Sequence, residues 1–149
     1  MTQRILFVCL GNICRSPTAE AVTRSKAAAR GLHLACDSAG TAEWHVGKPP
    51  YGPMQTAAAR RGYDLSALCA RQVAPADFDR FDKIIAMDGE NLADLAQMGD
   101  PAKLCLMTDF APGAGYDAVP DPYYTRDFDG ALDLIALCAD GLLDQLAKG

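Results

Sequence analysis

Histidine is scarce in this chain, since His33 and His45 are the only two and neither has a partner at the spacing of a metal-binding motif. Six cysteines are present, but no two of them form a Cys-x-x-Cys pair, and most lie among apolar residues. A disulfide framework would need an ordered pattern of cysteine spacings, which is missing here. We therefore expect neither structural disulfides nor a metal site.

Long apolar runs and basic clusters are also missing. No apolar run approaches the roughly 20 residues of a membrane-spanning helix, and the amino terminus lacks the apolar core of a signal peptide. The net charge is −5 and no run of Lys and Arg occurs, which disfavours nucleic-acid binding. We expect a cytoplasmic protein that binds neither a membrane nor a nucleic acid and is a monomer, or at most a weak dimer.

The chain alternates between short apolar runs and segments of helical composition. Half of its residues are apolar, and without a repeat or linker we read residues 1–149 as a single domain. Strands are predicted at residues 5–8, 32–39, 83–87 and 103–107, and helices at 17–30, 54–61, 88–98 and 128–148. Such alternation is typical of an α/β fold with a four-stranded parallel sheet and helices on both faces.

The turn that follows the first strand has the features of an anion cradle. Cys9 ends the strand, and Arg15 stands six residues later at the start of a helix. Gly11 and Asn12 readily adopt left-handed backbone angles, which would turn N–H groups inward, and Pro17 suits a first helical turn. An arginine fork, loop amides and a helix start all attract an oxyanion and favour the thiolate form of the cysteine.

The predicted phosphate-binding residues are those of the whole turn: Leu10, Gly11, Asn12, Ile13, Cys14, Arg15 and Ser16. Ser16 could cap the helix, hydrogen-bond the thiolate, or do both. The structural alternative is an ordinary strand-to-helix turn with a buried cysteine and an arginine that faces solvent.

A second motif, Asp121-Pro122-Tyr123-Tyr124, lies far downstream in a turn-rich loop. The prolines at positions 120 and 122 restrict the backbone and would hold the Asp121 carboxyl in one direction. On its own the motif is typical of a simple Asp-Pro turn. Together with the segment Phe7–Pro17, however, it resembles the low-molecular-weight protein tyrosine phosphatase family, and the resemblance extends along essentially the whole chain.

This resemblance implies a flavodoxin-like, phosphotyrosine phosphatase I-like three-layer sandwich and a reaction without a cofactor. It implies that Cys9 attacks phosphorus, that Arg15 and the loop amides hold the phosphate, and that Asp121 first donates and later accepts a proton. It also implies that Cys14 can form a reversible disulfide with the nucleophile, although a small packing residue is an equal alternative.

The substrate would be a phosphotyrosine-containing protein or a small aryl phosphate. Its ring would lie in a pocket formed by Trp44, Tyr123 and Tyr124. The alternatives are that Trp44 seals the core and that one of the tyrosines only fills the fold.

The chain departs from the family pattern at two places. Leu68 stands where many relatives have a histidine that supports the cradle asparagine, so we expect Asn12 to be supported from elsewhere, with Ser38 as a candidate. Residues 51–54 replace an Asp-Pro-Arg sequence, so the loop there should differ in shape.

Three other functions remain open. An arsenate reductase shares the cradle but needs two further cysteines close together, whereas Cys69 and Cys105 lie far apart in the sequence. A phosphoarginine phosphatase and a phosphate-binding module without activity would use the same cradle.

Overall fold

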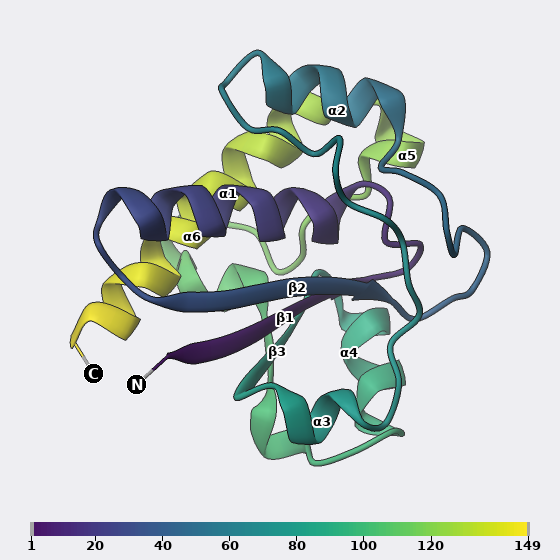
Figure 1. Ribbon diagram of the computed structural model, residues 1–149, viewed down its shortest axis with the longest axis vertical. Helices are drawn as coiled ribbons and strands as arrows, with labels where there is room; N and C mark the ends of the chain where they lie inside the picture. Colours follow the sequence, from purple (N-terminus) through teal and green to yellow (C-terminus); the bar gives the residue numbers. More distant parts are fainter. Residues whose placement is uncertain (1, 149) are drawn as a thin grey trace.

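A parallel β-sheet forms the centre of the computed structural model, which describes residues 2–148. Its four strands are β1 (Gln3–Cys9), β2 (Leu34–Gly40), β3 (Lys83–Ala86) and β4 (Leu104–Leu106), in the order β2-β1-β3-β4. All three strand pairs are parallel, and β1 contacts both β2 and β3 (Figure 1). The carboxyl end of a central strand is where ligands bind in open sheets of this type, and Cys9 is the last residue of β1.

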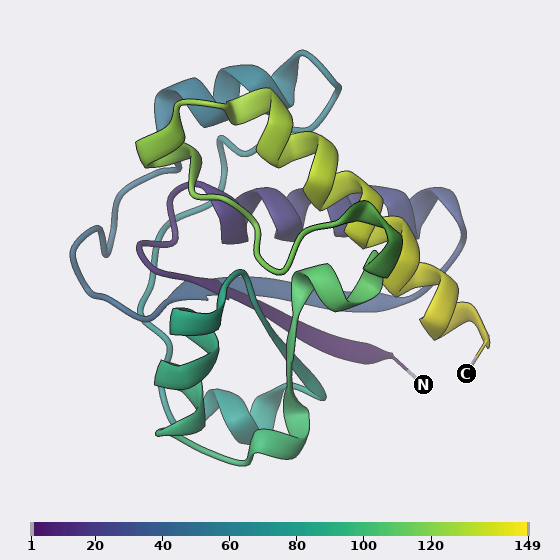
Figure 2. The ribbon, with the colours of Figure 1, turned by 180° about the vertical axis from the view of Figure 1, so that it is seen from behind.

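Helices cover both faces of the sheet and complete a three-layer sandwich. Helices α1 (Arg15–Ala29) and α6 (Phe128–Lys148) lie on one face, with α2 (Gly52–Ala59) and α5 (Pro122–Thr125) beyond them. Helices α3 (Asp77–Arg80) and α4 (Gly89–Ala96) lie on the opposite face, as the reverse view in Figure 2 shows. Short 3₁₀ turns occupy Pro101–Lys103, Met107–Phe110 and Pro112–Ala114. The predicted sheet and its two helical layers are therefore confirmed.

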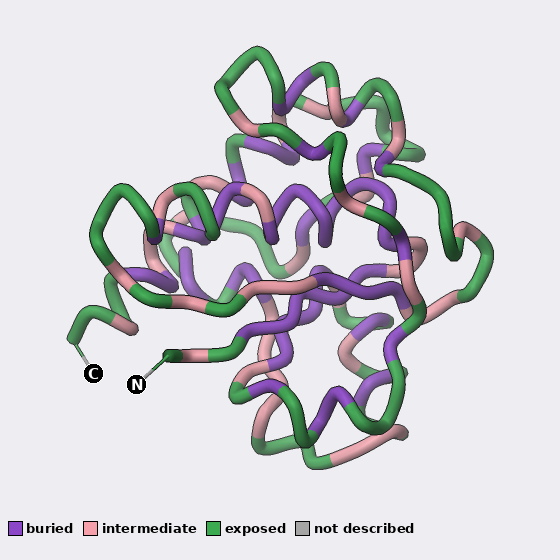
Figure 3. Tube along the Cα trace, viewed as in Figure 1, coloured by how far each residue is buried: buried purple, intermediate pink, exposed green. Residues whose placement is uncertain are grey.

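Strand β1 separates two apolar cores because its side chains alternate between the faces. Ile5 and Phe7 pack into the core beneath α1 and α6, whereas Leu6 and Val8 pack into the core beneath α3 and α4. Burial in β1 extends to Cys9, is partial at Leu10 and Gly11, and resumes at Asn12 to continue into α1 (Figure 3). The turn is thus held between well-packed elements on both sides.

Most predicted element boundaries lie within three residues of the observed ones. The last helix begins and ends as predicted, and Asp88 caps α4 as expected by accepting a hydrogen bond from the Asn91 N–H at 2.8 Å. Helix α1 begins earlier than predicted, at Arg15, and the first strand extends to Cys9. Helices α3 and α5 were not predicted, because four residues are too few to show a helical period.

Candidate active site

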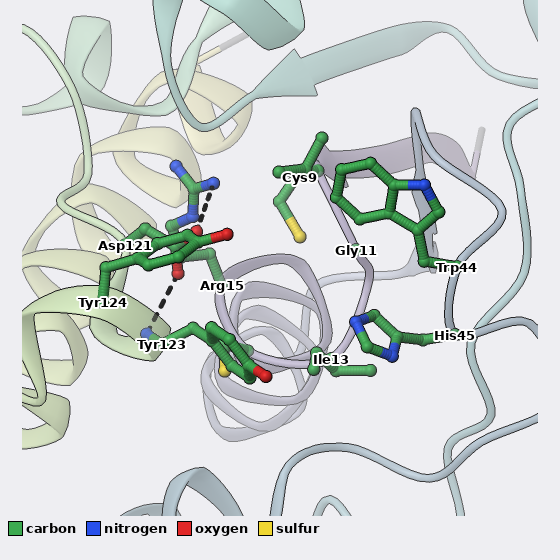
Figure 4. Close-up of a pocket in the computed structure, with 11 residues that line it drawn as sticks. Cys9, Gly11, Ile13, Arg15, Trp44, His45, Asp121, Tyr123 and Tyr124 are labelled. Carbon is green, nitrogen blue, oxygen red and sulfur yellow. Dashed lines mark hydrogen bonds and ion pairs between the residues drawn. The ribbon is translucent and has the colours of Figure 1, made fainter.

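The turn from β1 to α1 surrounds the sulfur of Cys9. Cys9 is buried, and its Sγ lies 3.0 Å from Ser16 Oγ and accepts a hydrogen bond from the Asn12 N–H at 3.3 Å. Asn12 has a φ of 57°, the left-handed conformation predicted for it. Figure 4 shows the sulfur pointing into a pocket between the aromatic side chains. The turn therefore places a thiol at the floor of a cavity with polar hydrogens directed at it.

Glycine at position 11 serves a different purpose from the one predicted. Only Asn12 in this turn has a positive φ, so the left-handed conformation expected at Gly11 is not found. A Cβ at residue 11 would instead lie 2.9 Å from Cδ2 of His45. Glycine at position 11 therefore leaves room for the His45 ring, which packs over the loop backbone.

The side chain of Asn12 holds the turn in shape. Its Nδ2 donates to Ser16 Oγ at 2.7 Å and to Ser38 Oγ at 3.0 Å, and its Oδ1 accepts from the Arg71 N–H at 3.0 Å. Ser38 donates in turn to the buried carboxylate of Glu20 at 2.6 Å. The expectation that Ser38 supports Asn12 in the absence of a histidine at position 68 is confirmed. Ser16 does not cap α1, because its hydroxyl is directed at Asn12 and Cys9.

Strand β2 also fixes the turn from the side. The N–H groups of Thr41 and Ala42 donate to the carbonyls of Cys9 and Leu10, both at 2.9 Å. A Cβ at Gly40 would lie 2.8 Å from the Leu10 carbonyl oxygen, so only glycine allows this close approach. The N–H groups of Gly11 and Ile13 donate to no acceptor within residues 2–148. These donors can therefore serve an anion.

Arg15 is buried, which contradicts the alternative of an arginine that faces solvent. Its Nη1 donates to Asp88 Oδ2 at 2.7 Å and to the Val119 carbonyl at 3.1 Å, and its Nη2 lies 3.4 Å from Asp121 Oδ2. Burial alone would lower the pKa of Arg15, but the negative charge of Cys9 and the hydrogen bond to Asp88 raise it above its usual value. The contact between Arg15 and Asp88 joins residues 73 positions apart and was not predicted.

Asp121 lies at the edge of the same pocket. Its Oδ1 accepts from the Tyr123 N–H at 3.1 Å, so it caps the short helix α5, while Oδ2 faces Arg15. The side chain keeps about a quarter of its exposure, at 23%. The Asp121 carboxyl group therefore forms the predicted Asp-Pro turn and also lies beside the cradle.

Aromatic side chains form the walls of the pocket, as Figure 4 shows. Trp44 and Tyr124 are 64% and 69% exposed, so the alternative that Trp44 seals the core is wrong. Tyr123 meets Tyr124 edge to face with ring centres 5.3 Å apart. His45 completes the wall and was not predicted, although it directly follows Trp44 in a loop rich in glycine and proline.

Cys14 also lines the pocket and is buried in the turn. Burial and the nearby charge of Cys9 raise the pKa of the Cys14 thiol to about 12. All six cysteines are free. At neutral pH, Cys14 is therefore a neutral thiol beside the candidate nucleophile.

Within residues 2–148, no group of three or more His, Cys, Asp or Glu side chains is arranged to hold a metal ion. None of the helices in that part of the chain combines the length and apolar character that crossing a membrane requires.

A doubly wound parallel sheet with a Cys-x5-Arg turn at the carboxyl end of its central strand defines an α/β protein with a candidate oxyanion cradle. Residues 4–149 match the family described as low molecular weight phosphotyrosine protein phosphatase. The chain belongs to this family, and it is a phosphatase.

Individual relatives match nearly the whole chain. The low molecular weight protein-tyrosine-phosphatase YfkJ of Bacillus subtilis is 42% identical, with 97% of this chain and 96% of the relative covered. The crystal structure of YfkJ matches with a TM-score of 0.96 at 41% identity, covering 99% of this chain and 96% of that one. The structure of DARP, a Drosophila arginine phosphatase, matches with a TM-score of 0.89 at 30% identity, covering 95% and 96%.

Proposed function

We propose that this protein hydrolyses aryl phosphate monoesters, phosphotyrosine in particular, through a phosphocysteine intermediate. The observation that carries the proposal is the convergence of Cys9, Arg15 and Asp121 on one pocket with aromatic walls. Cys9 ends β1, Arg15 begins α1 and Asp121 precedes α5, and each has the chemistry that one part of the reaction needs.

In the first step, the Cys9 thiolate attacks phosphorus and the bond to the tyrosyl oxygen breaks. The free loop amides and the Nη2 side of the Arg15 fork hold the non-bridging oxygens, while Asp88 and the Val119 carbonyl keep Nη1 in place. Asp121 donates its proton to the departing oxygen, which avoids the release of a basic aryl oxide.

In the second step, a water molecule attacks the phosphocysteine. Asp121 now accepts a proton from that water, and the Ser16 hydroxyl stabilises the sulfur as it leaves. Inorganic phosphate is released, and Cys9 returns to its thiolate form.

The walls of the pocket support an aryl substrate. Ile13, Trp44, Tyr123 and Tyr124 present apolar surface and ring edges that suit a flat aromatic ring. Phosphoarginine is a second candidate, because an arginine phosphatase is among the similar structures. Among residues 2–148, Asp121 is the one acidic side chain that lines the pocket, and as the proton donor it is not available to pair with a substrate guanidinium.

Arsenate reduction has less support. Cys69 and Cys105, which would have to relay the oxidation, do not line the pocket around Cys9. Cys105 lies in β4, and burial raises the pKa of its thiol to about 11. A relay of thiolates would need these side chains at the cradle.

The test compares a phosphotyrosyl peptide, a phosphoarginyl peptide and p-nitrophenyl phosphate as substrates. We expect Cys9→Ser to abolish turnover and Asp121→Ala to lower kcat for the phosphotyrosyl peptide by about 10²–10⁴-fold. The loss should be smaller for p-nitrophenyl phosphate, because its leaving group needs little protonation. Undiminished activity of Asp121→Ala on the peptide would contradict the proposed role, and turnover of phosphoarginine alone would favour the second candidate.

Two further properties belong to this proposal. Cys14 would protect Cys9 from irreversible oxidation by forming a disulfide with it. Six free cysteines suit a reducing compartment, which supports a location in the cytoplasm.

A further inference from the structure

A second pocket lies directly beside the catalytic one and has no part in the chemistry described above. It has a volume of about 330 Å³. Its lining consists of Ile13, His45, Lys48, Pro49, Pro50, Tyr51, Gly52 and Tyr123. Ile13, His45 and Tyr123 also line the catalytic pocket, and Figure 4 shows these three side chains along one side of it. The two pockets therefore share a wall.

The backbone around the second pocket is tied to the phosphate cradle. The Tyr51 N–H donates to the Ile13 carbonyl at 2.8 Å, so the far wall is anchored to the turn that holds Cys9. Lys48 is held on both sides, since its N–H donates to the His45 carbonyl at 2.9 Å and its carbonyl accepts from the Ala70 N–H at 2.8 Å. These bonds fix the second pocket in relation to the reacting sulfur.

Arg126 holds the Tyr51 ring in position by two contacts, one to the ring face and one to the hydroxyl. Its guanidinium lies 5.4 Å from the centre of the Tyr51 ring and 5.1 Å from that of Phe128, and Nη1 donates to the Tyr51 hydroxyl at 3.1 Å. Arg126 ends α5 in the left-handed conformation, with a φ of 65°, and its N–H donates to the Pro122 carbonyl at 2.9 Å. The aromatic wall is thus preorganised.

Charge indicates what the second pocket accepts. The chain carries 19 acidic against 14 basic residues, and most of its arginines pair with a carboxylate. Lys48, in contrast, is exposed and makes no ion pair within residues 2–148, and the same holds for Arg126. An unpaired ammonium beside apolar proline and tyrosine surface is complementary to a side chain that has methylene groups and a carboxylate head.

We propose that this pocket binds an acidic residue, glutamate or aspartate, that flanks the phosphotyrosine in a peptide substrate. The carboxylate pairs with Lys48, and the methylene groups of the acidic residue lie against Pro49 and Tyr51. This selectivity rests on the proposed phosphatase function, because the phosphotyrosine must occupy the first pocket for its neighbour to reach the second. It makes the protein selective for acidic phosphopeptides over isolated aryl phosphates.

The experiment measures kcat/KM for matched phosphotyrosyl peptides that carry Glu, Gln or Leu at each flanking position in turn. The readout is the ratio of Glu peptide to Gln peptide within one enzyme variant, which cancels any general change in catalysis. At one flanking position, we expect wild type to prefer Glu by about two- to fivefold, the range of a single exposed ion pair. In Lys48→Glu the ratio should fall to about one or below, and in about 1 M salt it should fall toward one in wild type.

Lys148→Glu is the matched control, because it makes the same charge change at an exposed lysine that ends α6 and lines neither pocket, and it should keep the wild-type ratio. A ratio of one at every position in wild type, or an unchanged ratio in Lys48→Glu, would overturn the inference. A preference for Leu that does not depend on Lys48 would also overturn it and would identify an apolar occupant. If wild type turned over none of the peptides, the proposed function would fail as well.

Discussion

Two thiols share the turn between β1 and α1, and their surroundings give them different chemistry. The Cys9 sulfur accepts a hydrogen bond from the Asn12 N–H and lies 3.0 Å from Ser16 Oγ, whereas burial and the charge of Cys9 raise the pKa of Cys14 to about 12. A peroxide oxidises thiolates rather than thiols, and the proposed mechanism uses Cys9 as a thiolate, so under that proposal we expect Cys9 to be the first target and to become a sulfenic acid. The neutral Cys14 thiol can then condense with it, with loss of water, to give a disulfide.

This order of events makes a prediction for Cys14→Ser. After peroxide treatment followed by a dithiol, wild type should recover most of its phosphatase activity, because the disulfide is reducible, whereas Cys14→Ser should recover much less. Cys69→Ser, at an exposed cysteine outside the pocket, is the control and should recover like wild type. Equal recovery by wild type and Cys14→Ser would remove the protective role.

Among single residues, the sequence was sufficient to predict those site residues that belong to one short motif. Cys9, Asn12 and Arg15 lie within seven positions of each other, so strand, turn and helix chemistry alone bring them together. Asp88 and His45 were missed as parts of the site because their contacts depend on how distant elements pack. No local pattern indicates that a residue 73 positions away hydrogen-bonds Arg15.

At the scale of elements, helix α6 approaches the rest of the fold very closely at one glycine. A Cβ at Gly141 would overlap the carbonyl oxygen of Phe110, so the helix packs against the backbone of the turn Met107–Phe110. Helix α6 also pairs with α1 through ion pairs from Arg30 to Asp140 and Asp144. The glycine therefore sets the distance between α6 and the segment that follows β4.

We expect Gly141→Ala to lower the free energy of unfolding by about 1–3 kcal/mol, because the added methyl group overpacks this contact. Helix propensity works in the opposite direction, since alanine favours a helix over glycine by about 1 kcal/mol. Gly89→Ala is the matched control: residue 89 begins α4 with open space around its Cα, so the substitution should be neutral or stabilising. Urea unfolding of both variants measures the difference. A Gly141→Ala protein as stable as wild type would show that α6 can shift freely.

The helices that the sequence did and did not predict differ mainly in length. Helix α6 has 21 residues, and its apolar positions repeat at helical spacing, so its ends could be predicted. Helices α3 and α5 have four residues each and depend on caps and tertiary contacts rather than on a periodic pattern. The 3₁₀ turns after β4 have three or four residues, so they too show no periodic pattern in the sequence.

Over the whole molecule, four cysteines that are buried or partly buried share one physical property, a raised pKa. Burial raises the pKa of Cys14 to about 12, and that of Cys36, Cys105 and Cys138 to about 11. These thiols lie in different parts of the fold: the catalytic turn, two strands and the last helix. Their ionisation therefore couples the stability of the entire protein to alkaline pH.

The sign of this coupling follows from the direction of the shifts. Between the unfolded pKa near 9 and the folded pKa near 11, the unfolded chain has lost the cysteine proton and the folded protein still holds it. The contribution of these thiols to the free energy of unfolding is therefore fully present below about pH 9. It falls as the pH rises, by up to about 1.4 kcal/mol per pH unit for each such thiol.

We expect Cys138→Ala to make this decline shallower by up to that amount between about pH 9 and pH 11, even though the lost side chain lowers stability at neutral pH. The measurement is urea unfolding across this pH range under reducing conditions, and the quantity compared is the slope against pH. Cys69→Ala, at an exposed cysteine, should keep the wild-type slope. Because tyrosine and lysine ionisation is common to all three proteins, an identical slope in Cys138→Ala would mean that the buried Cys138 thiol does not couple folding to pH.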